Sequence, residues 1–210
     1  MKTSLPTRAF AIAAYALFAL ATAAFVAFLL DIGPWKTIGR GDGFGAPWLA
    51  NPLLIALWAL HHSLFARAPV KRWLERRLPP GSERALYVAA ASALLLLLIV
   101  GWQPLPEPLW QPRGELGRAA LLAALALGWT IVVAATFEID HAALFGLRQA
   151  FGGAARDDGG FVTPWMYRRV RHPMMTGFLL ALWTVPDFSV GHAQLAFALT
   201  LYVVVGTRLD

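Results

Sequence analysis

The chain has 210 residues, of which 58% are hydrophobic and only 14% are charged. A soluble globular domain carries roughly 25% charged residues, so this composition indicates a membrane protein. The formal net charge is +6 and there are no cysteines, which excludes a disulfide framework, a thiolate metal site and a cysteine nucleophile.

Four long runs without a charged residue follow one another through the first part of the chain. Each approaches or exceeds the roughly 20 residues that a helix needs to cross about 30 Å of hydrocarbon, and none alternates like a barrel strand. The first run is longer than the apolar core of a signal peptide, so we interpret it as a retained span. We therefore predict four transmembrane helices, near residues 9–30, 50–66, 85–103 and 118–138.

The connections between these runs have different characters. The segments 31–49 and 102–117 are rich in Gly, Pro and Trp, which predicts extended loops at the membrane interface. Residues 67–84 predict a short amphipathic helix on the membrane surface, ended by Pro79-Pro80-Gly81. Ser82 is then a candidate N-cap for the third span.

The last apolar region is divided by one charged residue. Residues 172–186 are too few to cross a bilayer, and after Asp187 another 20 uncharged residues run from 188 to 207. This pattern predicts a helical hairpin whose short first arm leaves the preceding polar segment inside the membrane envelope. The expected fold is thus an all-α integral membrane protein with four spans plus a C-terminal helical hairpin, giving five to six membrane helices.

The cations are distributed asymmetrically about these spans. With the spans placed as above, 14 of the 18 Lys and Arg residues fall on one side and four on the other. The positive-inside rule then places the N-terminus and the loops 67–84 and 140–172 in the cytoplasm. We expect a multi-pass protein of the cytoplasmic (inner) membrane, in contact with lipid, whose basic charge requires no nucleic-acid partner.

Two polar clusters lie on the predicted cytoplasmic side. One follows the fourth span and contains Glu138, Asp140, His141 and Arg148; the other is the stretch YRRVRHPMMTG, residues 167–177. Each has a plain structural explanation, namely a solvated helix end and a basic anchor before a helix that starts with proline. No phosphate-binding glycine loop is present, and the five histidines lack metal-site spacing, so we predict no metal.

The second cluster contains a recognisable motif. Residues 171–177, RHPMMTG, resemble the R-H-P-x-x-x-G motif of membrane methyltransferases of the isoprenylcysteine carboxyl methyltransferase superfamily, which bind S-adenosylmethionine from the cytosol. The blocks ALHHSLFARAPVKRW, FEIDHAALFGLRQ and YVVVGTRLD extend the resemblance over about residues 50–210, towards the methanethiol S-methyltransferase branch. NnrU-like membrane proteins share the H-S-x-x-A-R pattern.

The resemblance implies an S-adenosylmethionine-dependent methyltransferase that converts a small lipophilic thiol, most simply methanethiol, to a sulfide such as dimethyl sulfide. By this resemblance and its chemistry, we predict a catalytic set of His141, Arg148 and Arg171 and a substrate-binding set of His62, Ser63 and Glu138. The expected cofactor-binding residues are Tyr167, Arg171, His172, Pro173, Gly177 and Asp210. Arg171 would hold the carboxylate of the cofactor, and Gly177 would let adenosine approach the helix.

Two departures from the family pattern bear on this prediction. Met175 stands where prenylcysteine enzymes usually carry tyrosine, which favours a small thiol. The family also continues beyond Leu209 with an acidic pair and another helix, so the resemblance implies a chain shortened at Asp210. We expect one membrane domain over 1–210, with a three-span part (1–112) and a methyltransferase core (113–210). The alternatives are methylation of a larger lipophilic thiol or prenylcysteine-type carboxylate, or a non-catalytic NnrU-like protein of transport or haem association.

Overall fold

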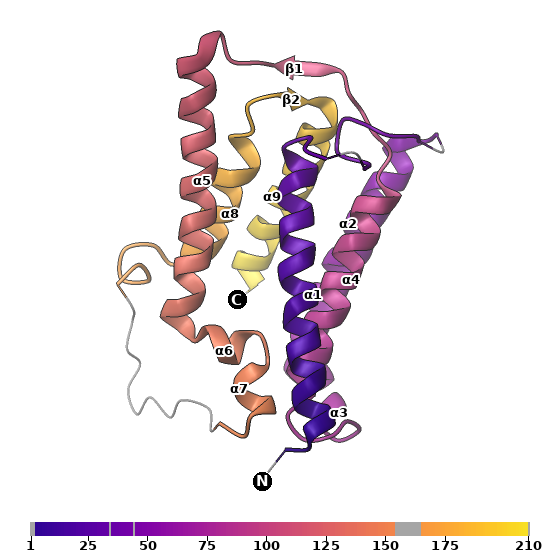
Figure 1. The fold of residues 1–210 in the computed structure, drawn as a ribbon, viewed down its shortest axis with the longest axis vertical. Coiled ribbons are helices and arrows are strands. Elements are labelled where there is room, and N and C mark those ends of the chain that lie inside the picture. The colour runs from indigo at the N-terminus through magenta and orange to yellow at the C-terminus, as the bar shows by residue number, and fades with distance from the viewer. Residues whose placement is uncertain (1–2, 34, 44, 154–164, 210) are drawn as a thin grey trace.

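The computed structural model describes residues 3–33, 35–43, 45–153 and 165–209. In these residues, helices make up nearly all of the regular structure (Figure 1). The elements in chain order are α1 (Leu5–Leu29), α2 (Pro47–Ala66), α3 (Ala68–Glu75), α4 (Glu83–Gly101), β1 (Pro108–Trp110), α5 (Gly114–Ile139), α6 (His141–Leu144), α7 (Leu147–Ala150), α8 (Pro173–Trp183), β2 (Phe188–Ser189) and α9 (Val190–Leu209).

The predicted all-α membrane fold is confirmed. Five helices, α1, α2, α4, α5 and α9, are long and apolar enough to cross a membrane, and α8 is a shorter apolar helix. Their ends differ from the predicted ends by a few residues. Helix α1 begins before its uncharged run and includes Arg8, because the Ser4 hydroxyl accepts a hydrogen bond from the Thr7 N–H and caps the helix earlier.

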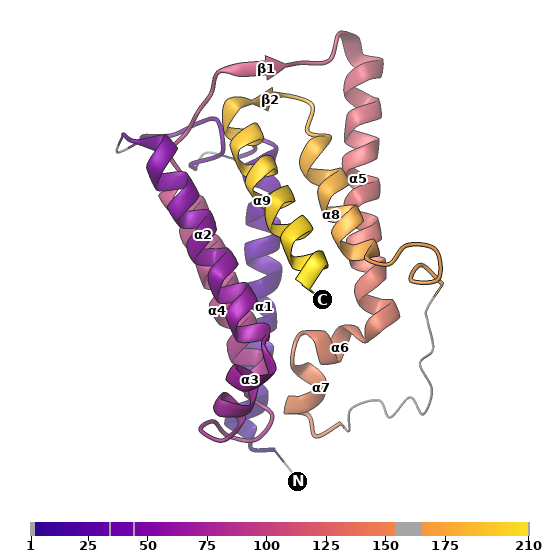
Figure 2. The same ribbon diagram turned by 180° about the vertical axis from the view of Figure 1, so that it is seen from behind.

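The helices form a bundle with two chemically different ends. Helix α1 packs against α4, α4 against α2, and α5 against α8, while α9 contacts both α2 and α8. Figure 2 shows α9 between these two partners. The N-terminal start of α1 gathers with α3, α6 and α7 at one end, which we call the basic end. Strands β1 and β2 lie at the other, which we call the far end (Figure 1).

Small residues bring the helices of the bundle close together. Ala11 and Ala14 of α1 pack with Ala85 of α4, and all three are buried. Gly146, between α6 and α7, has a φ of +83°, and a Cβ placed on it would lie 2.7 Å from the backbone nitrogen of Ala85. Only glycine combines that backbone conformation with so close an approach. The α6–α7 turn is therefore seated directly on the start of α4.

The far end is tied together by buried polar contacts. The Asn51 side chain donates to the Gln103 carbonyl at 2.9 Å and to the Gln194 side chain at 2.7 Å, so it joins α2 and α9 to the end of α4. Strands β1 and β2 pair antiparallel, and Arg118 forms an ion pair with Asp187 at 2.7 Å. These contacts stabilise the turn of the predicted hairpin.

Two smaller predictions have different outcomes. The amphipathic helix predicted in 67–84 is present as α3, with Leu74 buried and Trp73 exposed. Ser82 does stand at the N-cap position of α4, but the prediction that it caps the helix is wrong. Its hydroxyl donates instead to the Pro79 carbonyl at 2.7 Å, because the chain arrives through a turn that offers this nearer acceptor.

Candidate active site

The motif residues Arg171 and His172 lead directly into α8. Arg171 is exposed, His172 is half-buried, and Pro173 is buried as the first residue of the helix. The His172 carbonyl accepts from the Thr176 N–H, but its ring makes no capping bond. Among the described residues, no hydrogen bond or ion pair engages either the guanidinium of Arg171 or the imidazole of His172. Both are available to a ligand.

The motif segment is attached to the end of α5 through Glu138. Both oxygens of its carboxylate accept from the Met166 N–H, at 3.2 and 3.1 Å. The next residue, Tyr167, has a pKa raised by burial and by the negative charge of Glu138. The structure therefore brings together Glu138 and Tyr167, two residues that the sequence separates by 29 positions.

The contact between α5 and α8 determines where the motif residues lie along the length of α5. Gly177 of α8 lies against Gly128 of α5. Helix α5 continues for about 16 Å from that contact to Ile139, whereas Arg171 lies at most about 13 Å along the chain from Gly177. Arg171 is therefore level with the last turns of α5, inside the length of the bundle. This agrees with the short first arm predicted from the sequence.

Gly177 itself has a packing role in the structure. A Cβ on this residue would lie 2.6 Å from the Gly128 carbonyl oxygen and 2.9 Å from the Cβ of Ile131. Helix packing is thus sufficient to require glycine here. Its predicted contact with adenosine stays a prediction.

His141, the first residue of α6, is held by hydrogen bonds on both ring nitrogens. Its Nε2 lies 2.8 Å from the Tyr15 hydroxyl, and its Nδ1 lies 2.8 Å from the Thr136 hydroxyl. The Thr136 hydroxyl donates its single hydrogen to the Val133 carbonyl, so it must accept from Nδ1–H. Nε2 is then the acceptor of the Tyr15 O–H. Burial also lowers the pKa of His141, which favours this neutral form.

Arg148, in α7, pairs with Asp140 at the end of α5. The distance from Arg148 Nε to Asp140 Oδ2 is 2.7 Å, and the side chains are 35% and 10% exposed. The other carboxylate oxygen of Asp140 accepts from the Ala143 N–H at 3.0 Å and caps α6. The contacts of Arg148 shown here are therefore structural, and its predicted catalytic role remains untested.

The predicted substrate residues His62 and Ser63 belong to a separate polar group on α2. The Nδ1 of His62 lies 3.0 Å from the Tyr87 hydroxyl of α4, and the Ser63 hydroxyl donates to Tyr202 of α9 at 3.1 Å. The His62 ring also stacks on Trp58. Three helices therefore meet in one group of tyrosine, histidine and serine side chains.

An aromatic layer connects this group to His141. Tyr87 and Phe145 belong to one buried cluster, and Tyr15 packs against it. The ring of Phe145 lies 4.7 Å from that of His141 and 5.6 Å from that of Tyr15. The arginine at position 84 stacks on Tyr87 and donates to the Leu144 carbonyl. The layer thus spans α2, α4, α1 and α6 near the basic end.

Sequence analysis named Tyr167 as a cofactor-binding residue but missed the other three tyrosines, which complete the contacts of His141, His62 and Ser63. The chain has four, and all four contribute to the candidate site: Tyr15 at His141, Tyr87 at His62, Tyr202 at Ser63 and Tyr167 beside Glu138. Tyr15, Tyr87 and Tyr202 lie in apolar spans. A tyrosine hydroxyl there needs a partner, and this requirement could have indicated these three residues from the sequence.

Asp210 lies outside the described residues. In the described ranges, no group of three or more His, Cys, Asp or Glu residues is arranged to hold a metal ion. The free guanidinium and imidazole before α8 suit an anionic group such as a carboxylate.

Comparisons with known proteins identify a family and several similar relatives. Residues 52–206 match the family model described as NnrU protein. The chain is 38% identical to methanethiol S-methyltransferase of Pseudomonas sp. strain GM41(2012), over 96% of this chain and 79% of that protein. It is 42% identical to methanethiol S-methyltransferase of Pseudomonas deceptionensis, over 86% of this chain and 71% of that protein.

A third relative extends the same pattern to another genus. The chain is 40% identical to methanethiol S-methyltransferase 2 of Bradyrhizobium diazoefficiens, over 96% of this chain and 79% of that protein. No solved structure matches the chain.

Proposed function

Because this chain belongs to the NnrU protein family, we propose that it is a membrane methyltransferase that transfers a methyl group from S-adenosylmethionine to methanethiol and forms dimethyl sulfide. The observation that carries the proposal is the identity of 38–42% with three methanethiol S-methyltransferases over most of the chain. The matched residues 52–206 include the motif at the start of α8, together with His62, Ser63, Glu138 and His141.

The segment before α8 is the proposed place for the methyl donor. Bound S-adenosylmethionine would supply a methyl group on a sulfonium, which leaves readily when a sulfur nucleophile attacks in line. Arg171 would hold its carboxylate through a bidentate pair, and His172 would add a directional donor. Both side chains are without partners among the described residues, so binding would not first have to break a protein contact.

The thiol acceptor must lose its proton, because the thiolate and not the thiol is the nucleophile. The cations at positions 168, 169 and 171 favour the anionic form of a nearby acceptor. His141 is the proposed base, and since its Nε2 accepts from Tyr15, the proton would arrive through that hydroxyl. The thiol would give its proton to the Tyr15 oxygen as the Tyr15 proton moves to Nε2. His62, Ser63 and Glu138 remain the proposed acceptor-binding residues.

The membrane arrangement follows from the charges. The basic end carries most of the cations, which supports a cytoplasmic location for this end and for the site. S-adenosylmethionine is charged and would come from the water side. Methanethiol is small and apolar, and it can approach through the lipid.

The proposal is tested with the full chain purified in detergent. S-adenosylmethionine and methanethiol are supplied, and S-adenosylhomocysteine and headspace dimethyl sulfide are measured together. We expect both products from the unaltered chain, and loss of both with Arg171→Ala. Arg113→Ala is the matched control, because it removes an exposed arginine at the far end and should leave turnover unchanged.

The outcomes separate the alternatives. If a larger lipophilic thiol or a prenylcysteine-type carboxylate were methylated faster than methanethiol, the acceptor would be wrong and the enzyme class right. Failure of the folded chain to bind S-adenosylhomocysteine, together with a haem absorbance band, would overturn the proposal in favour of a haem-associated membrane protein. Normal turnover by Arg171→Ala would overturn the role of Arg171.

A further inference from the structure

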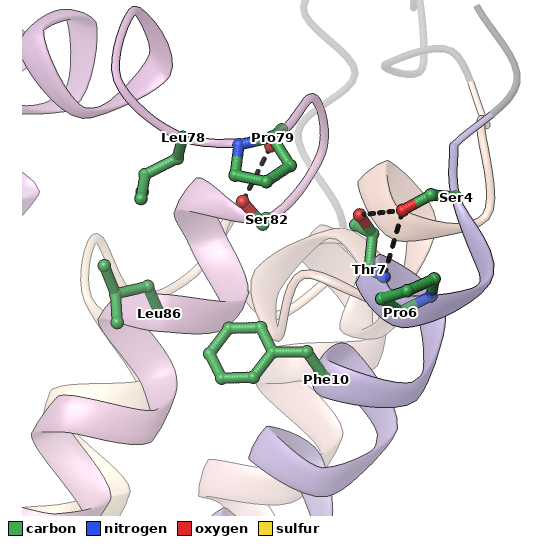
Figure 3. Close-up of a pocket in the computed structure, with 8 residues that line it drawn as sticks. All are labelled: Ser4, Pro6, Thr7, Phe10, Leu78, Pro79, Ser82 and Leu86. Carbon is green, nitrogen blue, oxygen red and sulfur yellow. Dashed lines mark hydrogen bonds between the residues drawn. The ribbon is translucent and has the colours of Figure 1, made fainter.

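A groove of about 300 Å³ lies at the basic end between the start of α1 and the segment that enters α4. Figure 3 shows Pro6 and Phe10 on one side of it, and Leu78 and Leu86 on the other. Phe10 is 37% exposed, so the groove is accessible from the side of the bundle. It lies at the first turns of two membrane-spanning helices, where the headgroup region of a bilayer meets the acyl chains.

The groove offers a mainly apolar surface, and the side-chain hydroxyls in its lining already have protein partners. The Ser4 and Thr7 hydroxyls are 2.9 Å apart and bond to each other, and the Ser82 hydroxyl donates to the Pro79 carbonyl at 2.7 Å (Figure 3). Each of these three hydroxyls therefore already has a protein partner, and the remaining lining is apolar. A hydrocarbon chain fits the exposed faces of Phe10, Leu78 and Leu86, because it needs only apolar contact.

The chain immediately before Leu78 is strongly cationic. Arg76 and Arg77 precede it, and both side chains are exposed. Within the described ranges, neither arginine forms an ion pair with an acidic residue. The guanidinium of Arg77 lies 5.8 Å from the centre of the Trp73 ring. Trp73 is 56% exposed, which suits a side chain at the membrane interface. Positive charge is thus available at the water side of an apolar groove.

From this combination we infer that the groove binds one anionic phospholipid. One acyl chain lies along Phe10 and Leu86, and the phosphate is held by Arg76 and Arg77. The two unpaired arginines select an anionic headgroup over a zwitterionic one, because the choline of phosphatidylcholine would be repelled by them. The site lies apart from Arg171 and is independent of the methyl-transfer chemistry.

The test uses the full chain purified in detergent and titrated with phosphatidylglycerol or phosphatidylcholine. The measurements are the midpoint of thermal unfolding and the number of retained lipids by native mass spectrometry. We expect phosphatidylglycerol to raise the midpoint more than phosphatidylcholine does. In Arg76→Gln/Arg77→Gln, the apparent affinity should fall roughly thirtyfold, the factor expected for two cations at an anionic lipid surface.

The matched control is Arg67→Gln/Arg72→Gln, which removes two cations from the same segment further from Leu78. It should retain most of the preference for phosphatidylglycerol. An equal loss in both double variants would overturn the site in favour of general surface electrostatics. Glycerol 3-phosphate, the headgroup without chains, should give no shift; if it stabilised the chain as much as the lipid, the groove would have no part in binding.

Discussion

Gly128 of α5 and Gly177 of α8 lie so close together that a Cβ on either would be 2.6 Å from the carbonyl oxygen of the other. Ala181, one turn further along α8 and fully buried, extends this contact on the same face. The spacing of Gly177 and Ala181 is the small-x-x-x-small pattern by which membrane helices approach closely. Because Arg171 is only six residues from Gly177, this contact also positions the motif segment.

Gly177→Ala should therefore destabilise the fold. The added methyl group would meet helix backbone rather than a flexible side chain, so α5 and α8 must separate, at a cost of about 1–3 kcal/mol. We expect a lower midpoint of thermal unfolding in detergent. Gly206→Ala in α9 is the matched control, since a Cβ there meets nothing within 4 Å; it should be neutral or slightly stabilising. Equal effects of the two substitutions would show that the α5–α8 contact is not tight.

Tyr15→Phe tests the proposed path of the thiol proton. The substitution removes the hydroxyl that donates to His141 Nε2 while keeping the ring that packs on Phe145. If the proton passes through Tyr15, kcat should fall about 10²-fold or more with little change in the binding of S-adenosylhomocysteine. Unchanged kcat over the full pH range would exclude Tyr15 from the path of the proton.

The lowered pKa of His141 leads to a prediction of how the stability of the fold depends on pH. Burial lowers its pKa in the folded state, so as the pH falls below the ordinary value of 6.5 the unfolded state takes up a proton first. The contribution of the neutral imidazole to stability is therefore complete above about pH 6.5 and is lost progressively down to the lowered pKa. His141→Gln should show a smaller decrease of the unfolding midpoint across this window. A larger decrease in the variant would contradict the direction of the shift.

The pair of Asp140 and Arg148 can be tested by a double-mutant cycle. Arg148→Met removes the guanidinium from a carboxylate that is only 10% exposed, so we expect a loss of about 1–2 kcal/mol, since the arginine itself is partly solvated. The double variant Asp140→Asn/Arg148→Met should lose less than the sum of the two single variants. Additive losses would indicate that the two side chains do not interact in solution.

The absence of cysteine makes the orientation directly measurable, because any introduced cysteine is unique. Asp42 lies in the loop between α1 and α2, and Glu75 is the last residue of α3; both are exposed and can be replaced by cysteine. In spheroplasts of a bacterial host, an impermeant maleimide should label Asp42→Cys directly and Glu75→Cys only after permeabilisation. The reverse result would place the basic end outside the cell.

Much of the fold follows from the sequence because membrane spans are local features. The length of an uncharged run is enough to predict a spanning helix, and the 15 residues before Asp187 were enough to predict a short first arm of the hairpin. The exact ends were less predictable. Ser4 caps α1 earlier than the charge pattern indicates, and Ser82 bonds within its own turn.

The partners within the candidate site could not be obtained in the same way. Tyr15 and His141 are 126 positions apart, and Ser63 and Tyr202 are 139 apart. Such pairs depend on which helices are neighbours, and neither run length nor periodicity contains that information. Motif spacing indicated Arg171 and His172, but it gave no reason to select Tyr87. Tyr87 contacts His62 and also packs in the aromatic layer, and both contacts depend on how the helices are arranged.

The short helix α8 has a consequence for where two immiscible reactants can meet. Its 11 residues span about 16 Å, so Arg171 lies level with the last turns of α5 rather than beyond the end of that helix. Water must reach that depth to solvate Arg171, and hydrocarbon surrounds the bundle at the same level. Under the proposed function, a water-soluble donor would reach Arg171 from the water side, and methanethiol dissolved in the bilayer would reach the site through the lipid. The proposed reaction would then draw one of its two reactants from the membrane itself.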